Sequence, residues 1–320
     1  MVDDIRFVFF PLGLKCAAFK GVFFMWFKNL QLYRLPAGWG ITSAQLEACL
    51  GTRPLQPCGS QDMESRGWVP PRDDGALLRS VGKQWLIALG MESRLLPSSV
   101  VRQEADSRAA ALAERLGYRP GRGQMKDLRE QVTRELLPRA FTRQHRTWVW
   151  IDPVNGWLGI DTSSAARAEE VLECLRQVLD DFPLALLRPA RSPASAMADW
   201  LAGDAPAGFS VDQDCELRSV SEEKSTVRYA HHPLDGSEIR NHLATGKMPT
   251  RLALTFNDRV SFVLTDKLEL KRLDFLDVVR EGLADEDDAE ALFDAEFAMM
   301  TGELAHLLPA LIEVLGGELA

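Results

Sequence analysis

The chain has 320 residues, of which 46% are hydrophobic and 26% are charged. These fractions are typical of a soluble folded protein and exclude a collagen-like or wholly disordered chain. The length predicts two or three domains. The net charge of −9 argues against a uniformly basic nucleic-acid binder, although the field that a ligand meets depends on where the charges lie.

The cysteines are few and scattered: Cys16, Cys49, Cys58, Cys174 and Cys215. Their number is odd and no C-x-x-C pair occurs, which argues against a secreted disulfide framework and against a structural zinc site. We therefore expect reduced thiols in a cytoplasmic protein that needs no metal and no cofactor.

Residues 1–24 are largely apolar, but they do not have the pattern of a signal peptide. Aspartates stand where basic residues are expected, and Pro11, Lys15 and Lys20 interrupt the apolar run. No stretch reaches the ~18 apolar residues that a membrane span needs. We expect a non-native or dispensable leader and a working chain that begins near Met25; a genuine N-terminal strand is the alternative.

The next segment predicts strands with one short helix. The apolar and aromatic run from Met25 predicts a strand, and Thr42 or Ser43 can cap a helix. The turn-rich segment 59–75 predicts a loop, and the apolar segment 84–89 predicts a buried strand.

Two helices are predicted between residues 98 and 146. Pro97 and the serines after it form a start signal, and Gly117–Gly123 interrupts the helical pattern. The second helix carries Leu128, Val132 and Leu136 on one stripe and stops at Pro138.

A hairpin is predicted next, with strands 148–151 and 157–160 around Asn155-Gly156. Ser163 or Ser164 then caps a helix that runs to about Leu179.

Pro183, Pro189 and Pro193 predict a boundary before a second mixed region. There, strands 252–256 and 260–264 form another hairpin, 268–273 adds a strand, and the helical segments 289–300 and 304–315 end at Gly316-Gly317. Pro309 should kink or divide the last helix. Strands and helices mix without regular alternation, so the predicted fold class is α+β.

Charge is segregated along the chain. Segment 98–146 has eleven basic and six acidic side chains, a net charge of +5, whereas segment 271–320 has three basic and thirteen acidic ones, a net charge of −10. Arginine dominates the basic segment, and its guanidinium suits bidentate contact with phosphate. The alternative is a solvated helix face with local ion pairs such as Glu130 with Arg134.

No catalytic or metal-binding set stands out. The spacing of His231, His232 and His242 fits no familiar zinc pattern, and the acidic run 285–288 fits a solvated helix start better than a calcium loop. Phe141 stands among basic residues, where a large apolar side chain either folds into the core or anchors a partner. The sequence alone favours the core for Phe141.

Several longer segments are distinctive and follow one another along the chain: MWFKNLQLYRL from Met25, PCGSQDMESRGWVPP from Pro57, LLPRAF from Leu136, WIDPVNG from Trp150, APAGF from Ala205, and FDAEFAMMTGELAHL with LIEVLGGE from Phe293. Through this ordered set the chain resembles the bacterial recombination-associated protein RdgC family. The resemblance covers residues 25–318 and leaves out only the leader and the last two residues.

The resemblance implies a DNA-binding protein that is not an enzyme. Members of the family form a closed, ring-shaped homodimer around duplex DNA, bind largely without sequence preference, and restrain RecA-promoted strand exchange. Each subunit has a central domain, here residues 25–97 and 147–187, a helical tip, residues 98–146, and a base domain, residues 188–320. Such a protein would be cytoplasmic and nucleoid-associated, with double-stranded DNA as its ligand, single-stranded DNA as an alternative ligand, and no membrane partner.

The resemblance also assigns residues. Phe141 becomes a contact between tips, which reverses the preference for the core. The expected nucleic-acid contacts are Arg115, Arg119, Arg122, Lys126, Arg139, Arg143, Arg228, His231 and His232. Some family members carry Lys-Gln where this chain has His231-His232, and histidine is mostly neutral at pH 7, so contact there is expected to be weaker and sensitive to pH.

Two other functions stay open on the sequence. A metal-dependent nuclease could use Asp285, Asp287 and Asp288 to hold divalent ions. A direct recombinase-interaction module could act without any need for DNA binding.

Overall fold

The computed structural model describes residues 25–36, 39–72, 74–219, 225–283 and 288–319. The leader, residues 1–24, lies outside the described residues, as do Asp285 and Asp287. Helices and strands are mixed, and every strand pairing is antiparallel, in agreement with the predicted α+β class.

One twelve-stranded sheet forms the frame, in the order β2-β4-β5-β6-β1-β12-β11-β10-β8-β9, with β3 beside β4 and β7 beside β1. The strands are β1 Asn29–Arg34, β2 Glu64–Val69, β3 Leu78–Val81, β4 Gln84–Arg94, β5 Thr142–Asp152, β6 Trp157–Ile160, β7 Ala185–Leu186, β8 Phe209–Ser219, β9 Thr226–Tyr229, β10 Lys247–Phe256, β11 Val260–Thr265 and β12 Leu270–Phe275. The helices in the described ranges are α1 Ser43–Leu50, α2 Ser98–Leu116, α3 Arg122–Leu136, α4 Ala165–Arg176, α5 Pro193–Ala202, α6 Ser237–Ala244, α7 Asp277–Arg280 and α8 Ala289–Val314.

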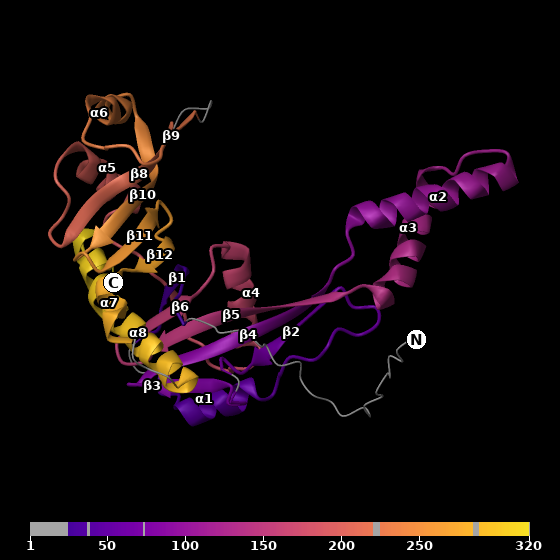
Figure 1. Cartoon of the computed structure of the whole chain (residues 1–320), viewed down its shortest axis with the longest axis horizontal. Coiled ribbons are helices and arrows are strands. Elements are labelled where there is room, and N and C mark those ends of the chain that lie inside the picture. Colours follow the sequence, from indigo (N-terminus) through magenta and orange to yellow (C-terminus); the bar gives the residue numbers. More distant parts are fainter. Residues whose placement is uncertain (1–24, 37–38, 73, 220–224, 284–287, 320) are drawn as a thin grey trace, which may run out of the picture.

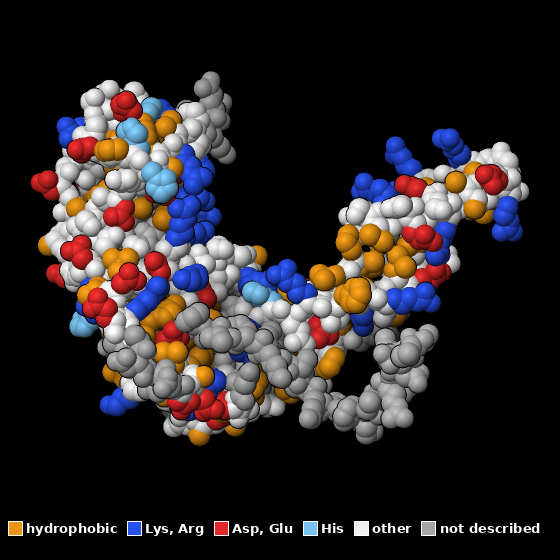
Figure 2. All heavy atoms as spheres, viewed as in Figure 1, with side chains coloured by type: hydrophobic (Ala, Val, Ile, Leu, Met, Phe, Trp, Pro, Cys, Tyr) orange, Lys and Arg blue, Asp and Glu red, His pale blue; other side chains and the backbone are white. Residues whose placement is uncertain are grey.

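The molecule is bent (Figure 1), and the space-filling view shows an open hollow on the inner side of the bend (Figure 2). The long strands β4 and β5 run along its floor toward the α2–α3 hairpin, which projects at one end. Strands β8 to β12 rise at the other end, and α8 lies along the outer side of the bend. We call the α2–α3 hairpin the tip and the sheet of β8 to β12 the base wall.

Strand β1 joins the two halves of the sheet. It pairs with β6 over four residues but with β12 over only two, Asn29 with Lys271 and Leu30 with Leu270. The carboxylate of Asp161, just after β6, accepts hydrogen bonds of 3.0 Å from the backbone N–H groups of both Lys28 and Asn29. This contact fixes the entry of β1 at the junction.

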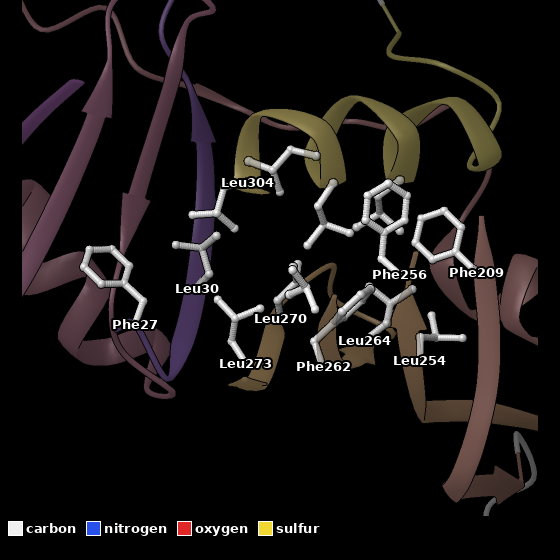
Figure 3. Close-up of a cluster of buried hydrophobic side chains, with 14 of the residues drawn as sticks. Phe27, Leu30, Phe209, Leu254, Phe256, Phe262, Leu264, Leu270, Leu273 and Leu304 are labelled. Atoms are coloured by element: carbon white, nitrogen blue, oxygen red, sulfur yellow. The ribbon is translucent and has the colours of Figure 1, made fainter. Parts of the chain in front are cut away.

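Helix α8 supports the junction from its outer side. Its buried apolar residues belong to a hydrophobic cluster that includes side chains of β1, β4, β5 and the base wall. In Figure 3, Leu304 of α8 lies beside Leu30 of β1, and Leu270 of the base wall is the next labelled leucine toward the base wall. Each such leucine contributes roughly 1.5–3 kcal/mol by leaving water. One core therefore spans the place where the strand pairing is short.

A buried carboxylate ties the start of the described chain to α8. Glu296 accepts hydrogen bonds from the backbone N–H of Met25 (2.7 Å) and from the indole N–H of Trp26 (2.9 Å). A buried carboxylate needs such donors, because an unpaired charge in the core is costly.

Helix α8 corrects two sequence expectations. Pro309 does not divide it, because α8 runs unbroken from Ala289 to Val314. By length and composition alone α8 could cross a membrane, contrary to the expectation that no segment qualifies, although its apolar side is packed in the core. The predicted glycine cap is confirmed: Gly316 has a φ of +85°, and Gly317 N–H donates to the carbonyl of Ile312.

The predicted loop 59–75 is wrong in part, because residues 64–69 form β2 along the edge of β4. The segment is rich in turn-forming residues, but its pairing with the long strand β4 overrides this local preference. A Cβ on Gly67 would lie 2.3 Å from the backbone nitrogen of Leu55, so this glycine permits close backbone approach rather than a turn.

The other predicted elements are confirmed with shifted ends. Thr42 caps α1, Ser164 caps α4, and both predicted hairpins form. Strand β5 begins at Thr142, six residues before the predicted start, and α4 ends at Arg176 rather than near Leu179. The two tip helices lie where the sequence predicts them, and α3 gives way at Leu137 to a short 3-10 turn that contains Pro138.

The junction predicts a pH-dependent stability. Burial raises the pKa of Asp161 from 3.8 to about 6, against the opposing effect of its two backbone hydrogen bonds. The contribution of this carboxyl to folding is therefore full below about pH 4 and is lost as the pH rises through 6. Asp161→Asn keeps an oxygen for both N–H donors and removes the charge, so its free energy of unfolding relative to the unchanged protein should rise by about 2 kcal/mol between pH 4.5 and 7.5.

Urea unfolding followed at several pH values measures this difference. A difference that stays constant across the range would contradict the titration of Asp161.

Candidate nucleic-acid interface

Basic side chains gather on the inner surface of the bend. Figure 2 shows Lys and Arg along the inner edge of the base wall, on the floor and on the tip, whereas many acidic side chains lie on the outer side. An acidic chain can thus present a positive field to whatever lies in the hollow.

The base wall owes its charge to the alternation of its strands. Arg251 of β10 points away from the core while its neighbour Leu252 is buried, and the same holds for Arg218 beside Leu217 on β8. Together with Lys271 and Arg272 of β12, these strands surround a cleft of about 320 Å³. Arg228, Tyr229 and Arg251 line the same cleft.

Carboxylates lie under these cations. Glu216 stands directly between Arg228 and Arg251 across neighbouring strands and approaches Arg251 to 3.9 Å. Asp214 binds Arg272 at 2.9 Å, and Glu269 binds Lys271 at 2.8 Å.

The three base-domain residues predicted from the sequence are all exposed. Arg228 lies on β9 and lines the cleft. His231 has a φ of +52°, and its backbone N–H donates to Asp214 at 3.0 Å. His232 follows it, with its ring 5.4 Å from that of Tyr229. The structure thus places Arg228 and His231 on the wall, next to its ion pairs.

On the floor, Arg143 is exposed at the tip end of β5. Two residues further, burial lowers the pKa of His145, and the nearby charges of Arg167 and Arg143 lower it further. Arg167, on α4, therefore adds a cation to this part of the floor, whereas the lowered pKa favours the neutral form of His145.

The tip carries the remaining predicted contacts, Arg115, Arg119, Arg122, Lys126 and Arg139, and all five side chains are exposed. Within the part of the chain that the structure describes, Arg115, Arg119 and Arg122 form no ion pair. Lys126 and Arg134 share Glu130, at 3.7 and 3.6 Å. Local ion pairing therefore accounts for part of the basic segment, but not for the cations around the turn between the helices.

The expectation from the sequence alone that Phe141 lies in the core is wrong. Its side chain is 84% exposed, and its carbonyl accepts the N–H of Leu95, whose side chain is half exposed. Tyr118 and Leu116 are exposed apolar side chains at the far end of α2. The contact between tips stays a prediction for Phe141.

No metal centre is assembled within the described ranges: no three His, Cys, Asp or Glu side chains there are placed so that they could hold a metal ion together. His242 lies near Lys247 rather than near other ligands, and Asp288 caps α8 by accepting the N–H of Glu290. Cys49, Cys58, Cys174 and Cys215 are free thiols, as the sequence predicts, and Cys16 lies outside the described residues.

Comparison with known proteins decides the family. A family profile described as "Putative exonuclease, RdgC" matches residues 25–318. The chain belongs to the RdgC family. It is 58% identical over 299 residues to the recombination-associated protein RdgC of Dechloromonas aromatica, covering 92% of this chain and 98% of the relative. It is 50% identical over 296 residues to the protein of the same name from Janthinobacterium, covering 92% and 99%.

In this RdgC family member, sequence reasoning missed the cations of the base wall and α4: Arg167, Arg218, Arg251, Lys271 and Arg272. They are scattered over more than 100 residues, so counting the charges within one segment of the sequence does not reveal them. The usable signal was local, since Arg218, Arg251 and Arg272 each adjoin a buried leucine in a strand and so occupy its outward face.

The tip of this RdgC family member is anchored to the sheet by Arg94, the last residue of β4. One terminal nitrogen donates to the carbonyls of Leu137 (3.0 Å) and Ala140 (3.3 Å), and the other donates to those of Gly59 (3.0 Å) and Cys58 (3.3 Å). A single guanidinium thus holds the end of the tip against the loop before β2.

Replacing this anchor should loosen the tip alone. In Arg94→Met the hydrogen bonds from a charged donor are lost, each worth about 1.5–3 kcal/mol. Amide hydrogen exchange should accelerate at least about tenfold in α2 and α3 and stay unchanged in β10 and β11. Arg176→Met, which removes an exposed partner of Glu169 on α4, serves as the control. Uniform acceleration throughout the protein would refute a local anchor.

Proposed function

We propose that the protein binds double-stranded DNA without sequence preference, as a homodimer that closes around the duplex and restrains RecA-mediated recombination. One observation carries this proposal: an acidic chain brings the cations of its tip, floor and base wall to the same hollow. The RdgC family and its recombination-associated relatives support the link to recombination.

The chemistry of the hollow suits the DNA backbone. Arginines dominate it, and a guanidinium binds a phosphate through two parallel hydrogen bonds. Cations spread over a wide concave surface neutralise phosphates and release condensed counterions, which favours binding to any sequence. Contacts to phosphates position a protein but do not distinguish bases.

A bent subunit open on one side can enclose DNA only with a second copy. The exposed Phe141 near the tip is suited to anchor such a contact, since large apolar side chains that leave water dominate interface energies. A closed ring would slow dissociation without new contacts, because DNA would have to leave by an end or through an opened interface. Rings on the DNA would then obstruct a RecA filament, in the cytoplasm and on the nucleoid.

The electrostatic part predicts a salt dependence. The logarithm of the affinity for a short duplex should fall linearly with the logarithm of the salt concentration, with a slope of about −0.9 for each phosphate contacted. Arg115→Gln, Arg119→Gln and Arg122→Gln should each weaken binding about equally for unrelated sequences and reduce the slope by about one. Fluorescence anisotropy on double- and single-stranded DNA measures both quantities.

Lys83→Gln, in the exposed turn between β3 and β4 at the end of β4 opposite the tip, removes the same charge and should leave the slope unchanged. A flat salt response of the unchanged protein would overturn the electrostatic proposal.

The ring predicts a different effect for Phe141. Phe141→Ala should weaken closure by about 2 kcal/mol or more if the ring buries this side chain at a contact. The variant should therefore leave closed circular DNA faster after a salt challenge, while its affinity for a short linear duplex changes little. Val154→Ala, which truncates another exposed apolar side chain on the turn after β5, is the control. Equal retention by the two variants would refute the role of Phe141 in closure.

The description of the family as an exonuclease favours one alternative, the metal-dependent nuclease. Of its three carboxylates, only Asp288 is described, and it caps a helix. Incubation of linear and circular DNA with Mg²⁺ or Mn²⁺ tests this function, and cleavage that a chelator abolishes would support it. The remaining alternative, a direct recombinase-interaction module, predicts that inhibition of RecA survives in a variant that no longer binds DNA.

A further inference from the structure

The cleft of the base wall holds its cations and their counter-ions in two layers. The arginine side chains are the outer layer, with Arg251 51% and Arg272 63% exposed. The carboxylates form the inner layer, with Glu216 14% and Asp214 25% exposed. A phosphate that enters the cleft therefore meets guanidinium groups first and finds carboxylates directly behind them.

The carboxylates are fixed in place by groups other than the cations. Glu216 accepts a hydrogen bond of 2.8 Å from the hydroxyl of Thr250. Asp214 accepts the backbone N–H of His231 at 3.0 Å, and this bond and the charge of Arg272 hold the pKa of Asp214 below its usual range. Both groups therefore stay in position when an arginine turns toward DNA, and Asp214 stays ionised at neutral pH.

Most cations of the cleft are already paired within the chain. Arg251 is paired with Glu216, which also binds Arg218 outside the lining of the cleft, Arg272 is paired with Asp214, and Lys271 is paired with Glu269. Four basic residues line the cleft: Arg228, Arg251, Lys271 and Arg272. Of these, Arg228 alone forms no ion pair with a carboxylate of the described residues. A phosphate gains little from a cation that is already neutralised at close range, because the fixed carboxylate repels it over the same few ångströms.

We propose that Asp214 and Glu216 compete with the phosphates of DNA for the arginines of the base wall and so weaken the binding of the base wall to the DNA backbone. The ligand class is the phosphodiester of duplex DNA, and the inference rests on the proposed function. If the base wall binds DNA weakly and the ring is closed, the DNA stays enclosed because the ring surrounds it, and the ring remains free to move along the duplex.

Conservative amides test the proposal. Glu216→Gln keeps an oxygen for Thr250, and Asp214→Asn keeps one for the N–H of His231, so each variant removes a charge with little change of shape. Each should bind a short duplex about three- to tenfold more tightly at 0.1 M salt, with a salt slope steeper by about 0.9 for each cation released to a phosphate.

The matched control is Glu313→Gln, an exposed carboxylate of α8 that does not line the cleft and carries the same change of net charge. Its affinity and slope should equal those of the unchanged protein. Thermal unfolding of all three variants checks that the fold is kept.

The outcomes separate the two proposals. If the unchanged protein binds DNA with a steep salt slope, and Glu216→Gln and Asp214→Asn bind no more tightly than Glu313→Gln, the competition is refuted and DNA binding stands. Weaker binding by the amide variants would also refute it, because these carboxylates would then position the cations. If the unchanged protein does not bind DNA, the proposed function itself fails.

Discussion

The pairing of β1 with both β6 and β12 is the constraint on which the shape of this protein depends. It makes one continuous sheet out of two halves that are far apart in sequence, and it does so on the β12 side through only two residue pairs. The shared core under α8, the carboxylate of Asp161 and the buried Glu296 reinforce this short ladder. The relative direction of the base wall and the floor, and therefore the hollow between them, follows from this junction.

The hollow creates an electrostatic problem, because cations brought close together repel one another. On the tip the problem is mild, since Arg115, Arg119 and Arg122 are exposed to water and screened by salt. On the base wall the strands lie about 5 Å apart, and the chain places a carboxylate between neighbouring cations, as at Glu216 between Arg228 and Arg251. If the protein binds DNA as proposed, the same arrangement that stabilises the wall would limit the attraction that it offers to a phosphate.

The parts of the molecule also differ in how firmly they are held. The base wall and floor share a large buried core, whereas α2 buries only Ala105 and Ala109 and α3 only Val132. The tip is a thin pair of helices attached through β4, β5 and the guanidinium of Arg94. In the proposed homodimer, a projecting element with so little core of its own would gain apolar contacts from the second copy.

The sequence by itself determined the local features of this protein. Helix caps at Thr42 and Ser164, the hairpin at Asn155-Gly156 and the glycine end of α8 depend on residues within a few positions of each other, so pattern and composition predict them. The ordered motifs likewise sufficed to indicate the RdgC family, which the comparisons confirm.

Only the tertiary structure decided what depends on distant residues. Residues 64–69 form a strand because β4 offers them an edge, and α8 continues undivided through Pro309, although division of the helix is one of the two outcomes that the local signal predicts. Phe141 is exposed because the core closes without it, and the wall of Arg218, Arg251 and Arg272 exists because strand pairing aligns residues from three separate segments. Sequence patterns report neighbours along the chain, whereas a surface charge pattern is set by neighbours in space.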